Sequence, residues 1–419
     1  MTPKVKKRIE QIRQGIVPEG YKKTESGIIP NEWRVGQVSK CIEEYKFFSN
    51  DISHIPVYSS SRKGLVPQSD YYNQREAVET NLGYKVVPQG YVTYRHMSDD
   101  DVFHFNINKT GENVLVSSEY PVFTSSDNCD LSFLISVLNN TARFRYFCKM
   151  QKLGGTRTRL YLDNLKRYAL ALPPFDEQKK IAEILATQDK AIELQGRKIE
   201  ELKRFKKGCL EKMFPRKGQK VPEKRFPGFT DDWERRKVGD ITIESTEYLT
   251  LDSGLPLFTS SRNGLLYQNE YRGNVTTNNK QTLFSVVPLG ACTYRHMSDD
   301  DVFHLNINTI EKGLVSREYP VFCGTPNHDI VFIVQHINSS KAFRAFCAEQ
   351  KMGGTRTRLY YKALCEFTMM VPSFAEQRRI SKFLLTIDHL ITLHQRKLEE
   401  MKKQKKALMQ LLLTGIVRV

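Results

Sequence analysis

The sequence lacks the features of a membrane or secreted protein. No apolar run reaches about eighteen residues, so it encodes no ordinary transmembrane helix. The first residues, MTPKVKKRIEQIRQG, contain no apolar core, and we therefore expect no secretory signal and a cytoplasmic protein. The eight cysteines are scattered without a C-x-x-C pair, which argues against a zinc ribbon and indicates reduced, mostly buried thiols.

Signatures of catalysis are missing as well. The chain has no G-x-x-x-x-G-K-[ST] phosphate loop and no PD…(D/E)xK nuclease run. The stretch LPPF at 172–175 resembles the (N/D)PP(Y/F) motif of adenine methyltransferases, but Leu172 cannot accept hydrogen bonds from an exocyclic amine, and the corresponding stretch at 371–374 is VPSF. We therefore expect no catalytic residue, no metal ion and no cofactor on this chain.

Basic residues are in excess. The 64 Lys and Arg outnumber the 47 Asp and Glu, which gives a formal net charge of +17. An excess of this size favours a polyanionic partner, most simply nucleic acid.

The chain is a tandem repeat of two units, each about two hundred residues long. TYRHMSDDDVFH occurs unchanged at 93–104 and 293–304, and FRYFCKMQKLGGTRTRLY (144–161) matches FRAFCAEQKMGGTRTRLY (343–360). Short Tyr-, Phe-, Val- and Thr-rich runs separated by Gly, Asn and Asp turns predict β-rich domains over 25–173 and 222–371. The differences concentrate at 66–84 against 266–284, and near 109–113.

A long helix is predicted after each domain, over 174–221 and 372–419. Pro173 and Pro174 precede the first helix, and its apolar positions alternate by four and three, as in a coiled coil. A single amphipathic helix packed on a globular domain is the alternative. The coiled-coil positions are Ile181, Leu185, Ile192, Ile199, Leu202, Ile380, Leu384, Ile391, Leu398 and Met401.

The two ends of the chain resemble one another. KKRIEQIRQGIV (6–17) is similar to KALMQLLLTGIV (406–417), so the helical segment at 1–24 completes a circular repeat. This arrangement predicts two antiparallel helices with an internal pseudo-two-fold. The expected fold class is α+β, with two similar mixed β-rich domains, each followed by a long helix.

The repeated motifs leave several interpretations open. His96, Asp99 and His104 could hold a metal ion, SDDD could be a hairpin turn that pairs with Arg95, or the stretch could contact DNA. In GGTRTRLY, Arg157 and Arg159 would share one face of an extended segment and could contact guanine or phosphate, or pair with SDDD. The DNA-binding candidates are Arg62, Lys63, Arg95, His96, Thr156, Arg157, Thr158, Arg159, Arg262, Arg295, His296, Thr355, Arg356, Thr357 and Arg358.

The whole chain resembles the specificity subunits of type I restriction-modification systems. The most specific marks are LPPFDEQKKIAEILATQDKAIE (172–193), VPSFAEQRRISKFLLTIDHLIT (371–392), IPNEWRVGQV (29–38) and TDDWERRKVGD (230–240). The resemblance implies two target recognition domains that each read half of a bipartite DNA sequence. It also implies helices that set the gap between the halves and dock two methyltransferase subunits.

The same resemblance implies that chemistry lies on other chains. S-adenosylmethionine, ATP and Mg²⁺ are expected on the methyltransferase and restriction (motor) subunits, and double-stranded DNA is the expected ligand of this chain, with no membrane contact. Because the two domains are so alike, we predict a nearly palindromic target. A coiled-coil assembly protein with protein-binding β domains is the alternative function, and a duplicated metal-dependent nuclease is a third.

Overall fold

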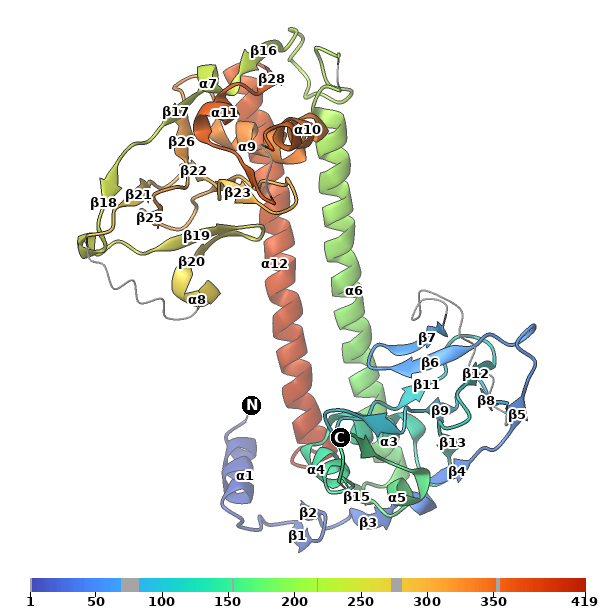
Figure 1. The fold of residues 1–419 in the computed structure, drawn as a ribbon. Helices are drawn as coiled ribbons and strands as arrows, with labels where there is room; N and C mark the ends of the chain where they lie inside the picture. The colour runs from blue at the N-terminus through green and yellow to red at the C-terminus, as the bar shows by residue number, and fades with distance from the viewer. Residues whose placement is uncertain (1, 69–82, 153, 217, 273–280, 352–354) are drawn as a thin grey trace. The chain divides into compact units, whose positions relative to one another are not determined.

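The computed structural model describes residues 2–68, 83–152, 154–216, 218–272, 281–351 and 355–419. The chain forms two compact units. The first unit comprises Met1–Gln195 and Lys397–Val419, and the second comprises Gly196–Arg396. Each unit contains a β-rich domain, the start of one long helix and the end of the other (Figure 1).

The described strands of the first unit are β1 (Tyr21–Thr24), β2 (Gly27–Pro30), β3 (Arg34–Gln37), β4 (Ile42–Glu44), β5 (Phe48–Ser49), β6 (Tyr58–Ser61), β7 (Gly64–Pro67), β8 (Tyr84–Val87), β9 (Val92–Thr93), β10 (Met97–Ser98), β11 (Asn106–Ile107), β12 (Val114–Val116), β13 (Val122–Ser125), β14 (Thr158–Arg159) and β15 (Ala169–Leu172). Its helices are α1 (Pro3–Arg13), a 3-10 turn (Val38–Lys40), α3 (Leu131–Asn140), α4 (Ala142–Lys149) and α5 (Leu162–Lys166).

The described strands of the second unit are β16 (Glu234–Lys237), β17 (Thr242–Glu244), β18 (Tyr248–Leu249), β19 (Phe258–Ser261), β20 (Gly264–Tyr267), β21 (Phe284–Val287), β22 (Cys292–Thr293), β23 (Met297–Ser298), β24 (Asn306–Ile307), β25 (Gly313–Ser316), β26 (Val321–Gly324), β27 (Thr357–Arg358) and β28 (Thr368–Val371). Its helices are α7 (Val238–Ile241), a 3-10 turn (Leu251–Ser253), α8 (Gln268–Arg272), α9 (Ile330–Ser339), α10 (Lys341–Glu349) and α11 (Tyr361–Cys365). The long helices are α6 (Phe175–Met213) and α12 (Phe374–Leu413).

The two β-rich domains have the same sheet topology. The first contains a four-stranded sheet in the order β11-β9-β13-β4, a three-stranded sheet β12-β8-β5 and the hairpin β6-β7. The second contains β24-β22-β26-β17, β25-β21-β18 and the hairpin β19-β20, and these strand pairs are antiparallel in both domains. The sequence repeat is therefore a repeat of the fold.

Aromatic side chains fill the space between the four-stranded sheet and the short helices. In the first domain the rings of Tyr94 and Phe105 lie 4.5 Å apart, and Phe105 meets Phe144 of α4 edge-on at 5.6 Å. All three side chains are almost fully buried. Asp130 caps α3 by accepting a hydrogen bond from the Phe133 amide (2.8 Å), which sets the start of the helix that covers this core.

Each long helix begins where the domain before it ends. One residue in the first turn, Gln178, attaches α6 to the first domain through two hydrogen bonds. Buried Gln178 accepts a hydrogen bond from the Asp130 amide (2.9 Å) and donates one to the Pro173 carbonyl (3.0 Å). At the start of α12, Gln377 repeats both contacts with Asp329 (2.8 Å) and Pro372 (2.9 Å).

Within each unit, the start of one long helix packs against the end of the other, so the two segments run antiparallel. Ile181 and Leu185 of α6 join one core with Leu412 of α12 in the first unit, and Ile380 and Leu384 of α12 join Met213 in the second. The predicted α+β fold class with paired antiparallel helices is confirmed.

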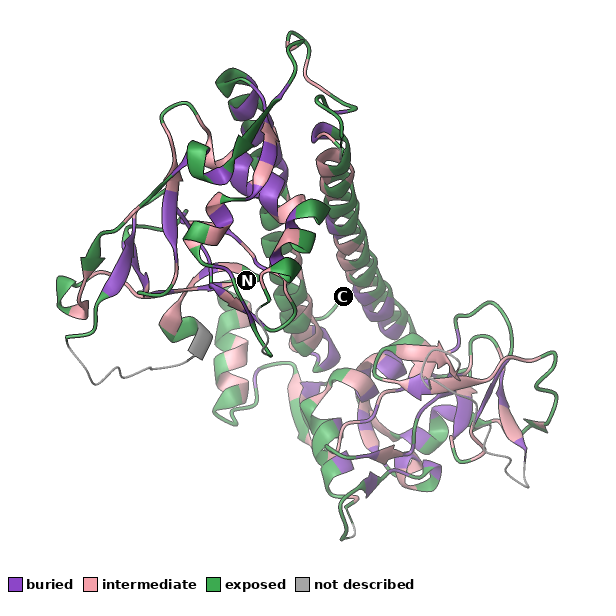
Figure 2. Cartoon of the chain, turned by 45° about the horizontal axis from the view of Figure 1, so that its top comes forward, coloured by how far each residue is buried: buried purple, intermediate pink, exposed green. Residues whose placement is uncertain are grey.

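The heptad positions along which the long helices pack, called the seam from here on, are buried mainly at these ends (Figure 2). Of the predicted coiled-coil positions, those buried are Ile181, Leu185, Ile199, Ile380 and Leu384, and those half-buried are Ile192, Leu202, Ile391, Leu398 and Met401.

Charged residues take part in the seam at matched positions. Lys206 pairs with Asp388 (2.8 Å) in the second unit, and Lys405 pairs with Asp189 in the first. Each lysine stands at a heptad position that would otherwise be apolar. These pairs help to fix the register of the two segments.

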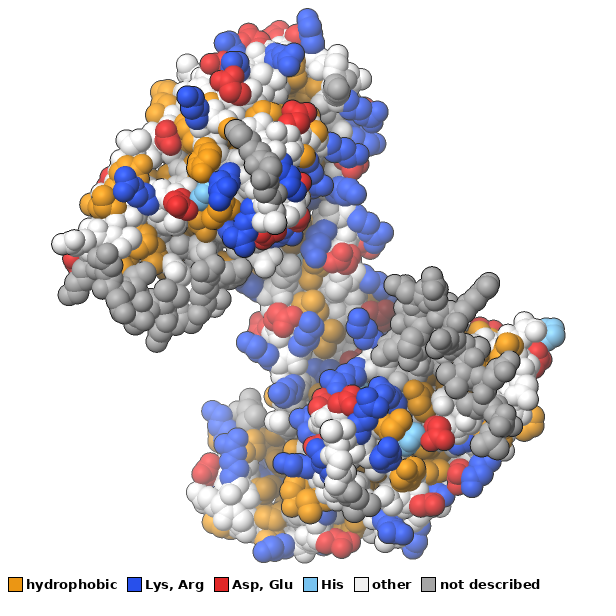
Figure 3. Space-filling view, viewed as in Figure 1, with side chains coloured by type: hydrophobic (Ala, Val, Ile, Leu, Met, Phe, Trp, Pro, Cys, Tyr) orange, Lys and Arg blue, Asp and Glu red, His pale blue; other side chains and the backbone are white. Residues whose placement is uncertain are grey.

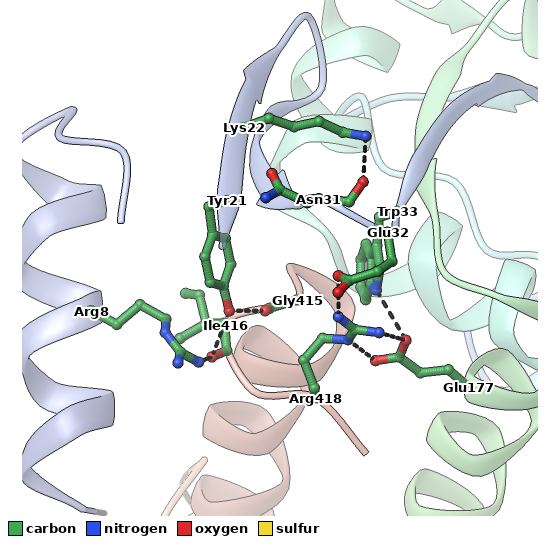
Figure 4. A network of polar contacts seen from close by, with 10 residues as sticks. All are labelled: Arg8, Tyr21, Lys22, Asn31, Glu32, Trp33, Glu177, Gly415, Ile416 and Arg418. Carbon is green, nitrogen blue, oxygen red and sulfur yellow. Dashed lines mark hydrogen bonds and ion pairs between the residues drawn. The ribbon is translucent and has the colours of Figure 1, made fainter. Parts of the chain in front are cut away.

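The two ends of the chain meet in the first unit (Figure 4). Arg8 of α1 donates to the Ile416 carbonyl (2.5 Å), and the Tyr21 hydroxyl donates to the Gly415 carbonyl (2.8 Å). Gly415 has a positive φ of 72°, which lets the chain turn away from the end of α12. Gly15 ends α1 in the same way, with φ 75°, so the sequence similarity of the two tails is also a structural one.

Arg418 and Arg225 perform the same task in the two units. Arg418 donates two hydrogen bonds to Glu177 in the first turn of α6 (2.6 and 2.8 Å), and Glu177 also accepts from the Trp33 indole (3.2 Å). Arg225 donates two hydrogen bonds to Glu376 in the first turn of α12 (both 2.7 Å). Each pair joins the segment after one long helix to the start of the other.

All eight cysteines are free thiols and none is exposed. None of the described helices is long and apolar enough to cross a membrane.

We expect Arg225→Met to lower the free energy of unfolding of the second unit by about 3–5 kcal/mol, because it leaves the fully buried Glu376 carboxylate without its donors. Arg418→Met should cost the first unit less, since Glu177 keeps the indole of Trp33. The chain has two tryptophans, one buried in each unit. Fluorescence during urea unfolding therefore reports the first unit in a Trp233→Phe background and the second unit in a Trp33→Phe background.

The Arg225→Met/Glu376→Met double variant is the control for this measurement, and it should recover most of the lost stability. Equal losses for Arg225→Met and Arg418→Met would contradict the role given to Trp33.

We expect the stability of the second unit to fall between pH 6.5 and 4 through His336, whose burial lowers its pKa from 6.5 to about 4. As the pH falls, the unfolded chain takes up the proton first, so up to about 3 kcal/mol of stability, present above pH 6.5, is lost. His336→Val should lower the slope of the unfolding free energy against pH, measured by urea unfolding, by the equivalent of about one proton. The variant should fold, because Val137 already occupies the matching buried position in the first unit. An unchanged pH slope would refute this assignment.

Candidate nucleic-acid interface

The two repeated motifs of each domain lie side by side. Met97 and Ser98 of β10 pair with Arg159 and Thr158 of β14, which brings TYRHMSDDDVFH against GGTRTRLY. The Leu160 amide donates to the His96 carbonyl (2.8 Å), which extends the pairing. In the second unit β23 and β27 pair in the same register. Both stretches therefore belong to one surface, repeated once in each unit.

The SDDD stretch forms a tight turn held by its own serine. Ser98 Oγ accepts from the Val102 amide (3.1 Å) and lies 2.9 Å from Asp100 Oδ1. Asp101 adopts a positive φ of 62° and Asp301 one of 60°, and these are the described non-glycine residues in that region of the backbone. Such a conformation costs free energy, so other contacts must hold it. The hydroxyl of Thr158 supplies one by donating to Asp101.

The aspartates of the turn pair with two arginines. Arg157 Nε donates to Asp99 Oδ1 (2.8 Å), and Arg62 at the tip of the β6-β7 hairpin pairs with Asp100 (2.6 Å). The sequence left open whether SDDD pairs with Arg95 or with the arginines of GGTRTRLY. The structure shows Arg157 and Arg62 as the partners, and the predicted pairing with Arg95 is wrong. Both arginine side chains are still more than half exposed, so donors remain available to a ligand.

The second unit repeats these pairs. Arg356 lies 2.8 Å from Asp299, and Arg262 lies 2.6 Å from Asp300. The hydrogen bond from Ser298, and after it the one from Arg262, lower the pKa of the Asp300 carboxyl, although partial burial opposes them. The Asp300 carboxylate therefore stays ionised and keeps its ion pair with Arg262.

His96 lies beneath an exposed tyrosine. Its ring is buried and stacks on Tyr161 with centroids 5.5 Å apart, and the Tyr161 side chain is half exposed. Burial lowers the pKa of His96, against the opposing influence of Glu119, whose carboxylate lies 3.5 Å from Nε2. His296 and Tyr360 repeat the stack at 5.4 Å. Neither tyrosine was among the residues predicted from the sequence, although each follows GGTRTRL directly.

The predicted DNA-binding residues divide into two groups. His96, Thr158, His296 and Thr357 are buried and support the turn from below. The exposed residues are Arg62, Lys63, Arg95, Thr156, Arg157, Arg159, Arg262, Arg295, Thr355, Arg356 and Arg358. Among these, Arg95 and Arg159, like Arg295 and Arg358, form no ion pair with any described residue. Residues 69–82 and 273–280, where much of the divergence between the repeats falls, lie outside the described residues.

On the face of each unit that Figure 3 shows, acidic and basic side chains are interspersed rather than gathered into one continuous basic area. Within the described part of the chain, no group of three or more His, Cys, Asp or Glu side chains is arranged to hold a metal ion. The geometry offers exposed guanidinium groups beside an acidic turn in each unit.

Two matched β-rich domains, combined with long helices that pair end to start, define a duplicated protein with two equivalent arginine-bearing surfaces. The sequence model of the family described as "Type I restriction modification DNA specificity domain" matches residues 35–204 and 316–403. The chain belongs to this family and is a type I restriction-modification specificity subunit.

Relatives and solved structures agree with this assignment. A Methanocaldococcus jannaschii protein named as the type I restriction enzyme MjaX specificity subunit is 24% identical over 436 residues, covering 96% of this chain and 97% of the relative. The MjaVIII specificity subunit of the same organism is 24% identical over 280 residues, or 61% of this chain and 63% of that protein.

The fold is similar to that of solved specificity subunits. A crystal structure of the type I restriction-modification S subunit from M. genitalium has a TM-score of 0.55 at 12% identity, covering 91% of this chain and 96% of that one. A chain from a study of complex assembly and conformational transition of the type I R-M system has a TM-score of 0.52 at 13% identity, covering 93% and 99%.

Proposed function

We propose that this chain reads a bipartite DNA sequence, one half with each β-rich domain. The observation that carries the proposal is the repetition of one exposed arginine surface in both units, with the same turn, the same aspartates and the same ion-pair distances. Aspartates that hold Arg157 and Arg62 in place reduce the entropy lost when these side chains meet DNA. The domains at 25–173 and 222–371 are then the target recognition domains.

The residues of each surface fall into contacting and supporting roles in this proposal. Arg95, Arg157 and Arg159, with Arg295, Arg356 and Arg358, contact DNA through guanidinium groups suited to phosphate or guanine. Lys63, Arg62 and Arg262 approach DNA from the hairpin tips, and Thr156 and Thr355 from the loops before β14 and β27. The buried His96, Thr158, His296 and Thr357 hold the surface in shape.

The chain itself is non-catalytic in this proposal and works by assembly. Its long helices, α6 and α12, set the distance between the half-sites and dock two methyltransferase subunits and the restriction subunits. They end at Met213 and Leu413, and not at the predicted positions 221 and 419. Leu194, Phe205 and Leu393 are large apolar side chains left more than half exposed on the long helices, as residues that await a partner would be. S-adenosylmethionine, ATP and Mg²⁺ belong to those partner chains.

The first experiment is long-read mapping of methylated adenine in cells that express this chain with the modification subunit of its own system. We expect a two-part motif with nearly palindromic halves that disappears when this chain is deleted. A motif with two unrelated halves would refute the near-palindrome, and a methylome independent of this chain would refute the reading function.

The exposed arginines provide a second test on the purified full-length chain. Arg159→Ala with Arg358→Ala should reduce the slope of log affinity against log salt by about 2 if both contact phosphates. The control is Lys4→Ala with Lys7→Ala, which removes the same charge from the exposed face of α1 and should leave the slope unchanged. An equal effect of both double variants would mean that net charge, rather than this surface, drives binding.

A further inference from the structure

The two hairpin tips have the same strand pairing and hydrogen bonds and differ in one side chain. Ser61 pairs with Gly64 across the β6-β7 turn, and Ser261 pairs with Gly264 across the β19-β20 turn. In both, the serine hydroxyl donates to the glycine carbonyl (2.9 and 3.0 Å) and accepts from the amide at the tip (3.1 Å in each). That tip residue is Lys63 in the first unit and Asn263 in the second.

The hairpins are fixed to their domains in the same way. Asn106 Nδ2 donates to Ser60 Oγ (2.8 Å) and the Ser61 carbonyl (2.9 Å), and Asn306 makes the matching bonds at 2.8 Å each. The preceding tip residue, Arg62 or Arg262, lies 2.6 Å from its aspartate in each unit. The backbone therefore holds residues 63 and 263 at equivalent places in the two units.

The tip in the second unit borders a polar pocket of about 350 Å³. Asn263 lines it together with Arg262 and Arg295, and the turn from Met297 to His304 supplies most of the remaining wall. The lining residues have identical counterparts in the first unit except at two positions, where Ser59 replaces Thr259 and Lys63 replaces Asn263. Serine and threonine both offer a hydroxyl, so the chemical difference between the pocket lining and its counterpart in the first unit lies at the tip.

Lysine and asparagine recognise different base edges. A lysine ammonium donates to O6 and N7 of guanine, whereas an asparagine amide accepts from N6 and donates to N7 of adenine. We propose that Lys63 and Asn263 are specificity-determining residues, which make the two half-sites differ at one equivalent position: guanine where the first unit reads and adenine where the second reads. This inference rests on the proposed DNA-reading function and adds a specific exception to a nearly palindromic target.

The test is a reciprocal exchange in the full chain, expressed with its modification subunit and followed by methylated-adenine mapping. Lys63→Asn should convert guanine to adenine at one position of one half-site, with a change in preference of about tenfold or more. Asn263→Lys should convert adenine to guanine at the equivalent position of the other half-site. Each exchange installs a residue that the same turn already carries in the other unit, so the hairpin accepts both.

Conservative variants complete the design. Lys63→Arg should keep guanine, and Asn263→Gln should keep adenine. The inference is overturned if both exchanges leave the motif unchanged, or if Lys63→Asn weakens methylation equally at all sites, as loss of a phosphate contact would. If no motif depends on the unaltered chain, the proposed function itself fails, and the two failures are thereby distinguished.

Discussion

The rest of the structure depends on one interaction, the ion pair between an arginine and a buried glutamate in the first turn of each long helix. Glu376 is fully buried and takes both hydrogen bonds from Arg225, and Glu177 receives Arg418 and the Trp33 indole. The neighbouring glutamine ties the same turn to the recognition domain. A buried charge without a partner is costly. In each unit, the start of one long helix, the segment that follows the other long helix and the β-rich domain are therefore held together.

This interaction explains the stretches by which the family was recognised. In LPPFDEQ and VPSFAEQ, the prolines precede the helix, the glutamate binds the arginine and the glutamine binds the domain. The sequence located these stretches and the helix starts because prolines and heptads act locally. It did not predict Arg225 or Arg418 as partners, because the ion pairs span 151 and 241 positions and no local pattern marks the arginine.

The candidate site was predictable in part, where its features depend on local sequence. The alternation in TRTR predicted that Arg157 and Arg159 share a face, and both are exposed with Thr158 buried between them. That His96 is buried beneath Tyr161 could not be read from the sequence, since histidine occurs both in cores and at surfaces. The pairing of Arg62 with Asp100 depends on a hairpin tip meeting a turn 38 residues away, which only the folded domain brings about.

The division of the chain between the units has a consequence for protein synthesis. The second unit is one continuous stretch, Gly196–Arg396, so all its parts have been made before translation ends. The first unit needs Lys397–Val419, and its contact between Arg8 and Ile416 joins residues 408 positions apart. The domain that leaves the ribosome first is therefore completed last, and until then the apolar side of its helix start, around Ile181 and Leu185, remains uncovered.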